Sequence, residues 1–168
     1  MAGRVTLILG GARSGKSRHA EALLAAEKPP WTYIATAQPL DPEMAARIAE
    51  HRARRGDDWR TVEAPLELPE ALAADPAMPA LVDCLTLWLS NLLLAGRAVA
   101  AAADALEAAL GVRAAPTALV SNEVGLGIVP DNALARAFRD EAGRLHQRLA
   151  ARADRVLLVV AGLPMVVK

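Results

Sequence analysis

Residues 10–17 read GGARSGKS, and Lys16 and Ser17 complete the pattern G-x-x-x-x-G-K-[ST]. The apolar residues 5–9 precede this stretch, and a segment of helical period follows it. A glycine-rich turn between a strand and a helix points backbone N–H groups at phosphate oxygens, and the helix N-terminus adds a favourable dipole. Lys16 is then expected to reach the β- and γ-phosphates, and the Ser17 hydroxyl to bind Mg²⁺. The stretch predicts a P-loop nucleotide-binding domain.

Apolar runs of strand length alternate with alanine-rich helical stretches along the rest of the chain, as in a parallel sheet covered by helices. The expected strands are residues 5–9, 31–35, 80–82, 117–120 and 156–161, with 60–63 as a weaker edge strand. The expected helices are residues 16–27, 42–55, 85–95, 99–110 and 132–151. The fold class that follows is α/β: a P-loop NTPase-like (RecA-like), mostly parallel sheet flanked by helices in three layers.

Local signals mark some of the boundaries. Asp41 before Pro42 predicts the start of one helix, and Asp131 the start of another. The prolines between residues 65 and 79 indicate a loop-rich connection with room for one short helix.

The composition sets limits on location and partners. The 168 residues fit a single domain, 1–168, and the 19 basic and 19 acidic residues give no net charge that would favour nucleic acid. One cysteine, Cys84, forms no internal disulfide, which fits a reducing cytosol. The longest uncharged apolar runs, 84–96 and 156–167, are shorter than the roughly 20 residues of a membrane span. We therefore expect a cytoplasmic protein without nucleic-acid or membrane partners.

A P-loop enzyme needs a second carboxylate near the Mg²⁺ ion, at the end of a neighbouring strand. Asp83 closes the apolar run ALVD and is the best candidate. The alternative is that Asp83 caps the helix that follows it.

His51 lies near the end of a helical segment with four arginines around it: Arg47, Arg52, Arg54 and Arg55. One interpretation is a solvated basic helix face. The other is chemical, because a neutral imidazole can attack a phosphoryl group while guanidinium groups neutralise the phosphates. His19 and His146 are expected to be structural.

Two further groups lie near the expected strand ends. Thr36, Ala37 and Gln38 follow the second strand at the edge where ligands bind in open α/β sheets. Glu63 shares a face with Trp59 and Thr61, and either accepts hydrogen bonds from guanine or forms a surface salt bridge.

These residues alone leave the reaction open. The guanine-reading N-K-x-D of switch GTPases is absent from the sequence. A single-activity P-loop kinase for a small alcohol fits the size of the chain, and a nucleotide-binding regulator without turnover is the alternative outside the enzymes.

Several longer segments carry a resemblance. They are GGARSGKSRHAE from Gly10, YIATAQ from Tyr33, D-x-E-M-x-x-R-I-x-x-H-R from Asp41, W-x-T-x-E from Trp59, DCLTLWLSNLL from Asp83 and SNEVGLGIVPDN from Ser121. With them the chain resembles, over almost its whole length, the bifunctional adenosylcobinamide kinase/adenosylcobinamide-phosphate guanylyltransferases of cobalamin biosynthesis. Gly56 stands where that family usually has proline, and His146 where asparagine is common.

The resemblance implies two reactions. ATP or GTP phosphorylates the hydroxyl of adenosylcobinamide; a histidine, here His51, then takes GMP from GTP and passes it to adenosylcobinamide phosphate. It also implies a homo-oligomer, possibly a homotrimer. Lys16 and His51 are the expected catalytic residues, and Ser17 and Asp83 the expected Mg²⁺ ligands. The nucleotide contacts implied by the resemblance are Gly10, Gly11, Ala12, Arg13, Ser14, Gly15, Lys16, Ser17, Thr36, Ala37, Gln38, Arg52, Ala53, Arg54, Arg55, Glu63 and Asp83.

Overall fold

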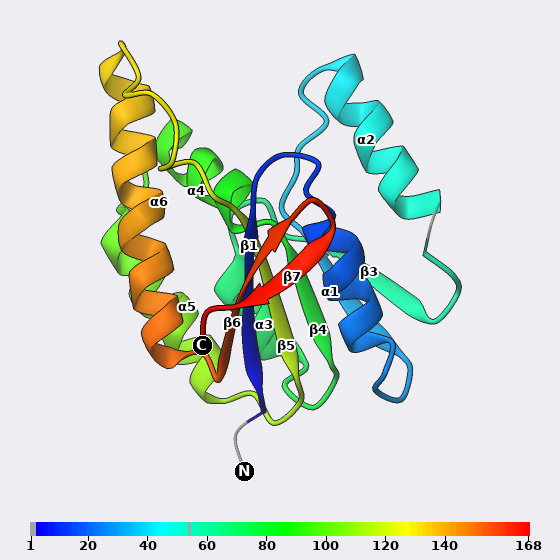
Figure 1. Cartoon of the computed structure of the whole chain (residues 1–168). Helices are drawn as coiled ribbons and strands as arrows, with labels where there is room; N and C mark the ends of the chain where they lie inside the picture. Colours follow the sequence, from blue (N-terminus) through cyan, green and yellow to red (C-terminus); the bar gives the residue numbers. More distant parts are fainter. Residues whose placement is uncertain (1–2, 54) are drawn as a thin grey trace.

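One sheet organises the protein. The computed structural model describes residues 3–53 and 55–168, without the side chain of Arg47, and within them seven strands lie in the order β3-β2-β4-β5-β1-β6-β7 (Figure 1). The strands are β1 (Val5–Gly10), β2 (Trp31–Ala35), β3 (Trp59–Glu63), β4 (Ala80–Asp83), β5 (Thr117–Asn122), β6 (Arg155–Val160) and β7 (Leu163–Val166). All neighbouring strands run parallel except β7, which is antiparallel to β6.

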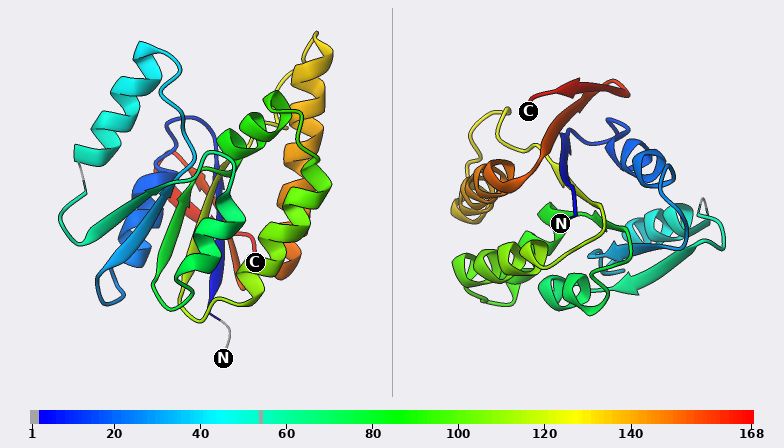
Figure 2. Two further views of the ribbon diagram at one scale, coloured as in Figure 1. Left: turned by 180° about the vertical axis from the view of Figure 1, so that it is seen from behind. Right: turned by 90° about the horizontal axis from the view of Figure 1, so that it is seen from below.

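Helices cover both faces of the sheet (Figure 2). The helices are α1 (Lys16–Leu24), α2 (Pro42–Ala53), α3 (Leu68–Ala74), α4 (Leu85–Leu94), α5 (Val99–Gly111) and α6 (Ala133–Arg152). α1 lies on one face and α3, α4, α5 and α6 on the other, while α2 stands beyond the carboxyl ends of the strands (Figures 1 and 2). The three-layer, mostly parallel α/β fold expected from the sequence is confirmed.

Two aliphatic cores separate the layers because the side chains of a strand alternate between its faces. Leu7 of β1 joins the core beneath α3 to α6, whereas its neighbour Ile8 joins the core beneath α1. Both side chains are fully buried. Of the described residues, no helix combines the length and apolar character needed to cross a bilayer.

Most boundaries agree with the expectation within a few residues, and two predictions were wrong. Asp41 does cap its helix, since its Oδ1 accepts the Met44 N–H at 2.7 Å. The cap of α6, however, is Asn132 and not Asp131, because the Asn132 side chain accepts the Ala135 N–H at 2.7 Å. A short helix, α3, occupies the proline-rich connection as expected.

The second error is at the end of the chain. β7 was not predicted, because the last strand expected from the sequence ends at residue 161. The chain turns back at Ala161 and Gly162, with φ of 50° and 79°, so that β7 pairs with β6 as an edge strand. Glycine at the second position makes this left-handed turn inexpensive.

A buried arginine joins α3, the connection after α3 and the start of β5, at the end of the sheet opposite the phosphate loop. Arg113 is 2% exposed; its Nε donates to Thr117 Oγ1 at 2.6 Å, and its Nη1 donates to the carbonyl oxygens of Leu72 at 2.6 Å and Asp75 at 3.2 Å. Nη2 donates to the Met78 carbonyl. Burial lowers the pKa of the guanidinium, with Asp75 opposing that shift. Arg113 therefore donates hydrogen bonds to carbonyl groups of α3 and of the connection that follows it, in a buried position.

We expect Arg113→Ala to lower the free energy of unfolding by about 3 kcal/mol, because several buried carbonyls lose a charged donor. Urea denaturation of both proteins measures the difference. Arg97→Ala is the control: Arg97 is half exposed and pairs with an exposed Glu67, so its loss should cost less than about 1 kcal/mol. Equal costs for the two variants would contradict a structural role for the buried arginine.

Candidate active site

The phosphate loop joins β1 to α1 and depends on its glycines. Gly15 has φ of 93°, in the left-handed region that favours glycine. A Cβ on Gly10 would lie 2.5 Å from Ser14 Oγ, so a side chain there would collide with the loop. Lys16 is 8% exposed, and its Nζ donates to the Gly11 carbonyl at 3.1 Å. The lysine head group is thus held against the inner edge of the loop.

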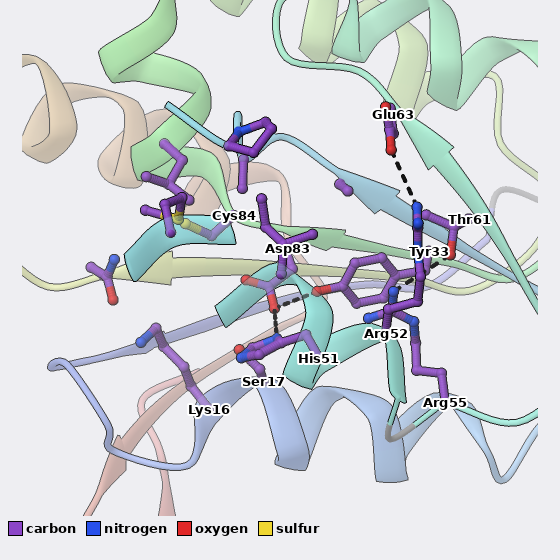
Figure 3. Close-up of a pocket in the computed structure, with 17 residues that line it drawn as sticks. Lys16, Ser17, Tyr33, His51, Arg52, Arg55, Thr61, Glu63, Asp83 and Cys84 are labelled. Atoms are coloured by element: carbon purple, nitrogen blue, oxygen red, sulfur yellow. Dashed lines mark hydrogen bonds and ion pairs between the residues drawn. The ribbon is translucent and has the colours of Figure 1, made fainter. Parts of the chain in front are cut away.

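A cavity of about 200 Å³ opens beside this loop, at the carboxyl edge of the sheet (Figure 3). Its lining comes from α1, β2 and the connection after it, α2 and the residues after it, β3, β4, α4 and the end of β5. The lining residues are Lys16, Ser17, Tyr33, Ala35, Ala37, Pro39, Met44, Ile48, His51, Arg52, Arg55, Thr61, Glu63, Asp83, Cys84, Leu87 and Asn122.

The carboxylate of Asp83 is the centre of this cavity. Its Oδ2 accepts the Tyr33 hydroxyl at 2.9 Å and lies 3.6 Å from His51 Nδ1. Burial alone would raise the pKa of the Asp83 carboxyl, but the adjacent His51 ring and the Tyr33 and Ser17 hydroxyls outweigh it and lower that pKa. Burial and the nearby carboxylate raise the pKa of the Tyr33 phenol. Asp83 is therefore ionised at neutral pH and Tyr33 is a hydrogen-bond donor.

Arg55 brings a partly unpaired cation into the same cavity. Its guanidinium carbon lies 3.5 Å from the centre of the Tyr33 ring, and its Nη2 donates to Thr61 Oγ1 at 3.4 Å. Within the described part of the chain, its buried Nε and Nη1 have no hydrogen-bond partner. Two buried N–H donors without acceptors favour an anionic or carbonyl-rich ligand at this position.

The lining residues follow an order across the cavity. In Figure 3, His51 and Asp83 lie between Lys16 on one side and Arg52, Thr61 and Glu63 on the other. Arg52 Nη2 and Glu63 Oε1 are 3.2 Å apart, with both side chains largely exposed. Such an exposed pair is weak and easily exchanged for a ligand.

The structure brings only part of the expected site together. Of the sequence-predicted residues, the following line the cavity: Lys16, Ser17, Ala37, His51, Arg52, Arg55, Glu63 and Asp83. Not among the lining residues are Gly10, Gly11, Ala12, Arg13, Ser14, Gly15, Thr36, Gln38 and Ala53. Arg54 and the side chain of Arg47 lie outside the described residues.

Thr36 is fully buried and has a structural position. Its Oγ1 donates to the Cys84 carbonyl at 2.7 Å and accepts the Cys84 N–H at 2.9 Å.

The N-cap position of α4 is Cys84, so Asp83 does not cap that helix. Glu63 forms the expected surface salt bridge, with Arg52, and its side chain also lines the cavity; its contact with guanine stays a prediction.

Sequence reasoning missed several lining residues, above all Tyr33 and Asn122. Alternation along β2 puts Tyr33 and Ala35 on the same face of the strand, and this signal was available. Asn122 lies at the carboxyl end of β5, two residues beyond the predicted end of that strand. The sequence places the loop from Asn122 to Gly127 on the ligand edge, but it assigns no role to Asn122.

Known proteins provide independent comparisons. The family model described as cobinamide kinase / cobinamide phosphate guanyltransferase matches residues 6–167. A bifunctional adenosylcobalamin biosynthesis protein, CobP, of Pseudomonas aeruginosa is 54% identical, with 96% of each chain covered. Proteins named CobU from Salmonella typhimurium and Escherichia coli are 48% and 46% identical, covering 96% of this chain and 98% of theirs.

A solved structure supports the fold alone. An ATPase from the type III secretion system of pathogenic bacteria superposes with a TM-score of 0.58 at 12% identity. The match covers 98% of this chain and 57% of that one.

A buried histidine lies behind the site, on α6. His146 Nε2 is 2.7 Å from Ser121 Oγ, and its Nδ1 is 4.0 Å from Glu123 Oε2. Burial lowers the pKa of the His146 ring from its usual 6.5, and Glu123 opposes the shift. The folded protein therefore holds this ring neutral at a pH where the unfolded chain takes up a proton.

We expect the free energy of unfolding to fall as pH drops below about 6.5 towards the lowered pKa of His146, because the unfolded chain binds the extra proton. His146→Asn removes this titration and should flatten the dependence between about pH 7 and pH 5. Urea denaturation at a series of pH values measures both slopes. An unchanged slope in the variant would refute the assignment.

Proposed function

The chain belongs to the cobinamide kinase / cobinamide phosphate guanyltransferase family, and we propose that it carries out both reactions in one cavity. In the first, ATP or GTP phosphorylates adenosylcobinamide. In the second, GTP gives its GMP to adenosylcobinamide phosphate through a guanylyl-histidine, forming adenosylcobinamide-GDP. The observation that carries the proposal is the position of His51 between the phosphate-loop lysine and the Glu63 end of the cavity (Figure 3).

GTP fits this order with its phosphates at the loop and its base near β3. Lys16 and the loop N–H groups bind the β- and γ-phosphates, as the motif predicts. Glu63 accepts hydrogen bonds from the N1 and N2 edge of guanine once Arg52 releases it, and the weak exposed Arg52–Glu63 pair makes this exchange inexpensive. The buried unpaired donors of Arg55 supply hydrogen bonds between these two ends.

Mg²⁺ is the ion that such a site takes. The Ser17 hydroxyl and the Asp83 carboxylate line the same cavity, and Ser17 helps to lower the pKa of that carboxyl; oxygen ligands of this kind suit Mg²⁺ together with phosphate oxygens. When bound, the ion neutralises phosphate charge. Ser17 and Asp83 are the residues that would hold it.

Asp83 also prepares His51 for guanylyl transfer. With Nδ1 directed at the carboxylate, the ring proton is on Nδ1 and the lone pair on Nε2 is free. Nε2 attacks the α-phosphorus of GTP, an Nε2–P bond forms, the bond to the bridging oxygen breaks, and pyrophosphate leaves. An oxygen of adenosylcobinamide phosphate then attacks the same phosphorus and releases His51.

Three coarser features belong to the same proposal. We infer that residues 1–168 act as one nucleotide-binding domain in the cytoplasm and that the chain forms a homo-oligomer, with a homotrimer as the proposed assembly. The resemblance of the sequence to its family supports the assembly, and the single cysteine supports the reducing compartment. A single-activity P-loop kinase remains the alternative to the bifunctional enzyme, and covalent labelling separates the two.

Incubation with Mg²⁺ and GTP labelled at its α-phosphate should leave an acid-labile, base-stable label on the protein, because a phosphoramidate forms at His51. His51→Asn should abolish the label, while His19→Asn, in which His51 is intact, should retain it. Scintillation counting of the denatured protein gives the stoichiometry.

Experiments in which the protein takes up no label distinguish the single-activity kinase from the regulator without turnover. A folded wild-type protein that binds GTP but takes up no label would overturn the guanylyltransferase and favour the single-activity kinase. Failure to bind any triphosphate would favour a regulator without turnover.

Lys16→Ala should weaken triphosphate binding about 10- to 100-fold in both half-reactions, since one charge-assisted contact to phosphate is lost. Titration calorimetry with GTP, together with separate assays of phosphorylation and guanylylation, measures this. Lys28→Ala removes an exposed lysine away from the cavity and should leave both activities intact. Loss of only one activity in Lys16→Ala would mean that the reactions use separate nucleotide sites.

A further inference from the structure

The carboxyl end of β5 has no role in the reactions described so far, although its last residue, Asn122, reaches the cavity. Asn122 lines the cavity together with Lys16, Ser17 and Asp83. Its strand lies between β1, which leads into the phosphate loop, and β4, which ends in Asp83. Asn122 is opposite Gly10 in the register with β1, while Asp83 is opposite Val120. Asn122 therefore extends two residues past the level of Asp83, beside the start of the phosphate loop.

The strand order shows which part of a nucleotide would meet Asn122. From the edge inwards the strands are β3, β2, β4, β5 and β1, and they contribute Glu63, Tyr33, Asp83, Asn122 and the phosphate loop in turn. Neighbouring strands are about 4.8 Å apart. A GTP molecule with its base at Glu63 and its α-phosphorus at His51 and Asp83 places its terminal phosphate one strand further, at Asn122.

Hydrogen bonds to Thr86 fix the position of Asn122 without a bound ligand. Its Nδ2 donates to Thr86 Oγ1 at 3.0 Å, and its backbone N–H donates to the same oxygen at 3.3 Å. Thr86 is 4% exposed and its Oγ1 lies 3.3 Å from Cys84 Sγ. A primary amide has two N–H donors, and Thr86 uses one of them.

The residues on either side of Asn122 are also fixed. Ser121 Oγ lies 2.7 Å from the buried His146 Nε2. Glu123 donates its backbone N–H to the Gly10 carbonyl at 3.0 Å, which ties this loop directly to the phosphate loop. A donor held on rigid elements costs little reorganisation when charge develops on a substrate.

We propose that Asn122 is a catalytic residue of the phosphoryl transfer and not of the guanylyl transfer. Its remaining amide N–H donates to an oxygen of the γ-phosphoryl group while that group passes to the acceptor hydroxyl. The acceptor oxygen forms a bond to the γ-phosphorus, the bond from that phosphorus to the β,γ-bridging oxygen breaks, the nucleoside diphosphate leaves, and the hydroxyl proton is released to water. This inference rests on the proposed function, since it assigns a residue to one of its two reactions.

The selectivity of Asn122 for phosphoryl transfer follows from the phosphorus atom at which bonds break in each reaction. In the kinase reaction charge and geometry change at the γ-phosphorus, so a donor placed there stabilises the transition state. In guanylyl transfer the change is at the α-phosphorus, and the γ-phosphate leaves unchanged as part of pyrophosphate. Asn122 then contributes equally to the ground state and the transition state, and its loss has little effect on that rate.

The test compares Asn122→Ala with the wild-type protein in two assays on the same preparations. We expect kcat for phosphorylation of adenosylcobinamide to fall on the order of 100-fold. The rate and yield of the α-phosphate label on His51, measured at saturating GTP, should stay within about threefold of wild type. Asn132→Ala is the matched control: it changes an asparagine that caps α6 on the same connecting segment and should leave both reactions intact.

Thr86→Val is the second variant, in case Asn122→Ala does not fold. It keeps the shape of the buried side chain but removes the oxygen that holds Asn122, so it should lower the phosphorylation kcat about tenfold and leave labelling of His51 unchanged.

Two results would overturn the assignment. If labelling of His51 falls as far as phosphorylation does in Asn122→Ala, the residue serves the whole site and not one reaction. If phosphorylation is unchanged, Asn122 does not contact the reacting group. A wild-type protein that neither labels nor phosphorylates would instead overturn the proposed function, and this inference with it.

Discussion

The parallel pairing of β5 with β1 on one side and with β4 on the other is the constraint on which the site depends. It brings the phosphate loop, Asn122 and Asp83 to one edge of the sheet from segments more than 35 residues apart in the sequence. A shift of one residue in either pairing would turn the side chains of β5 to the opposite faces. Because both faces are buried, under α1 and under α3 to α6, the aliphatic cores fix this register. The packing of ordinary leucines and valines thus sets the geometry of the polar groups.

Asp83 connects the parts of the site that the sheet alone does not place. Its Oδ2 faces both the Tyr33 hydroxyl and the His51 ring, so one ionised carboxylate orients an aromatic side chain from β2 and an imidazole from α2. The helix α2 has no buried side chain among those described. The polar contacts of its C-terminal end and of the residues after it, at His51, Arg52 and Arg55, therefore act together with the partly buried Met44 and Ile48, which also line the cavity, to position this segment.

The sequence alone predicted the fold class and two parts of the candidate site, the phosphate loop and Asp83. The phosphate loop and Asp83 are encoded locally, by a glycine pattern and by an acid at the end of an apolar run, so spacing alone predicted them. Alternation along β2 indicated the face on which Tyr33 lies, but the residues that Tyr33 and Asn122 meet depend on which strands become neighbours and how far each extends. β7 was missed because Gly162 and Pro164 follow the expected strand 156–161, and both residue types are unusual inside a strand. The cap at Asn132 was missed because Asp131 is an equally good cap by residue type, and only the path of the chain distinguishes them.

A single nucleotide site that performs two transfers must place different side chains at two phosphorus atoms of the same nucleotide. In this protein these side chains come from different elements of the fold. The proposed contact at the γ-phosphoryl group comes from β5, where hydrogen bonds to Thr86 and Gly10 fix the strand end. The nucleophile for the α-phosphorus comes from α2, whose described side chains are all at least partly exposed. Phosphoryl transfer needs little more than a rigid frame around a loose transition state. Guanylyl transfer needs a nucleophile that stays accessible when the triphosphate and the second substrate are bound. The exposed end of α2, which contacts the sheet through Asp83, meets this requirement better than the end of a central strand would.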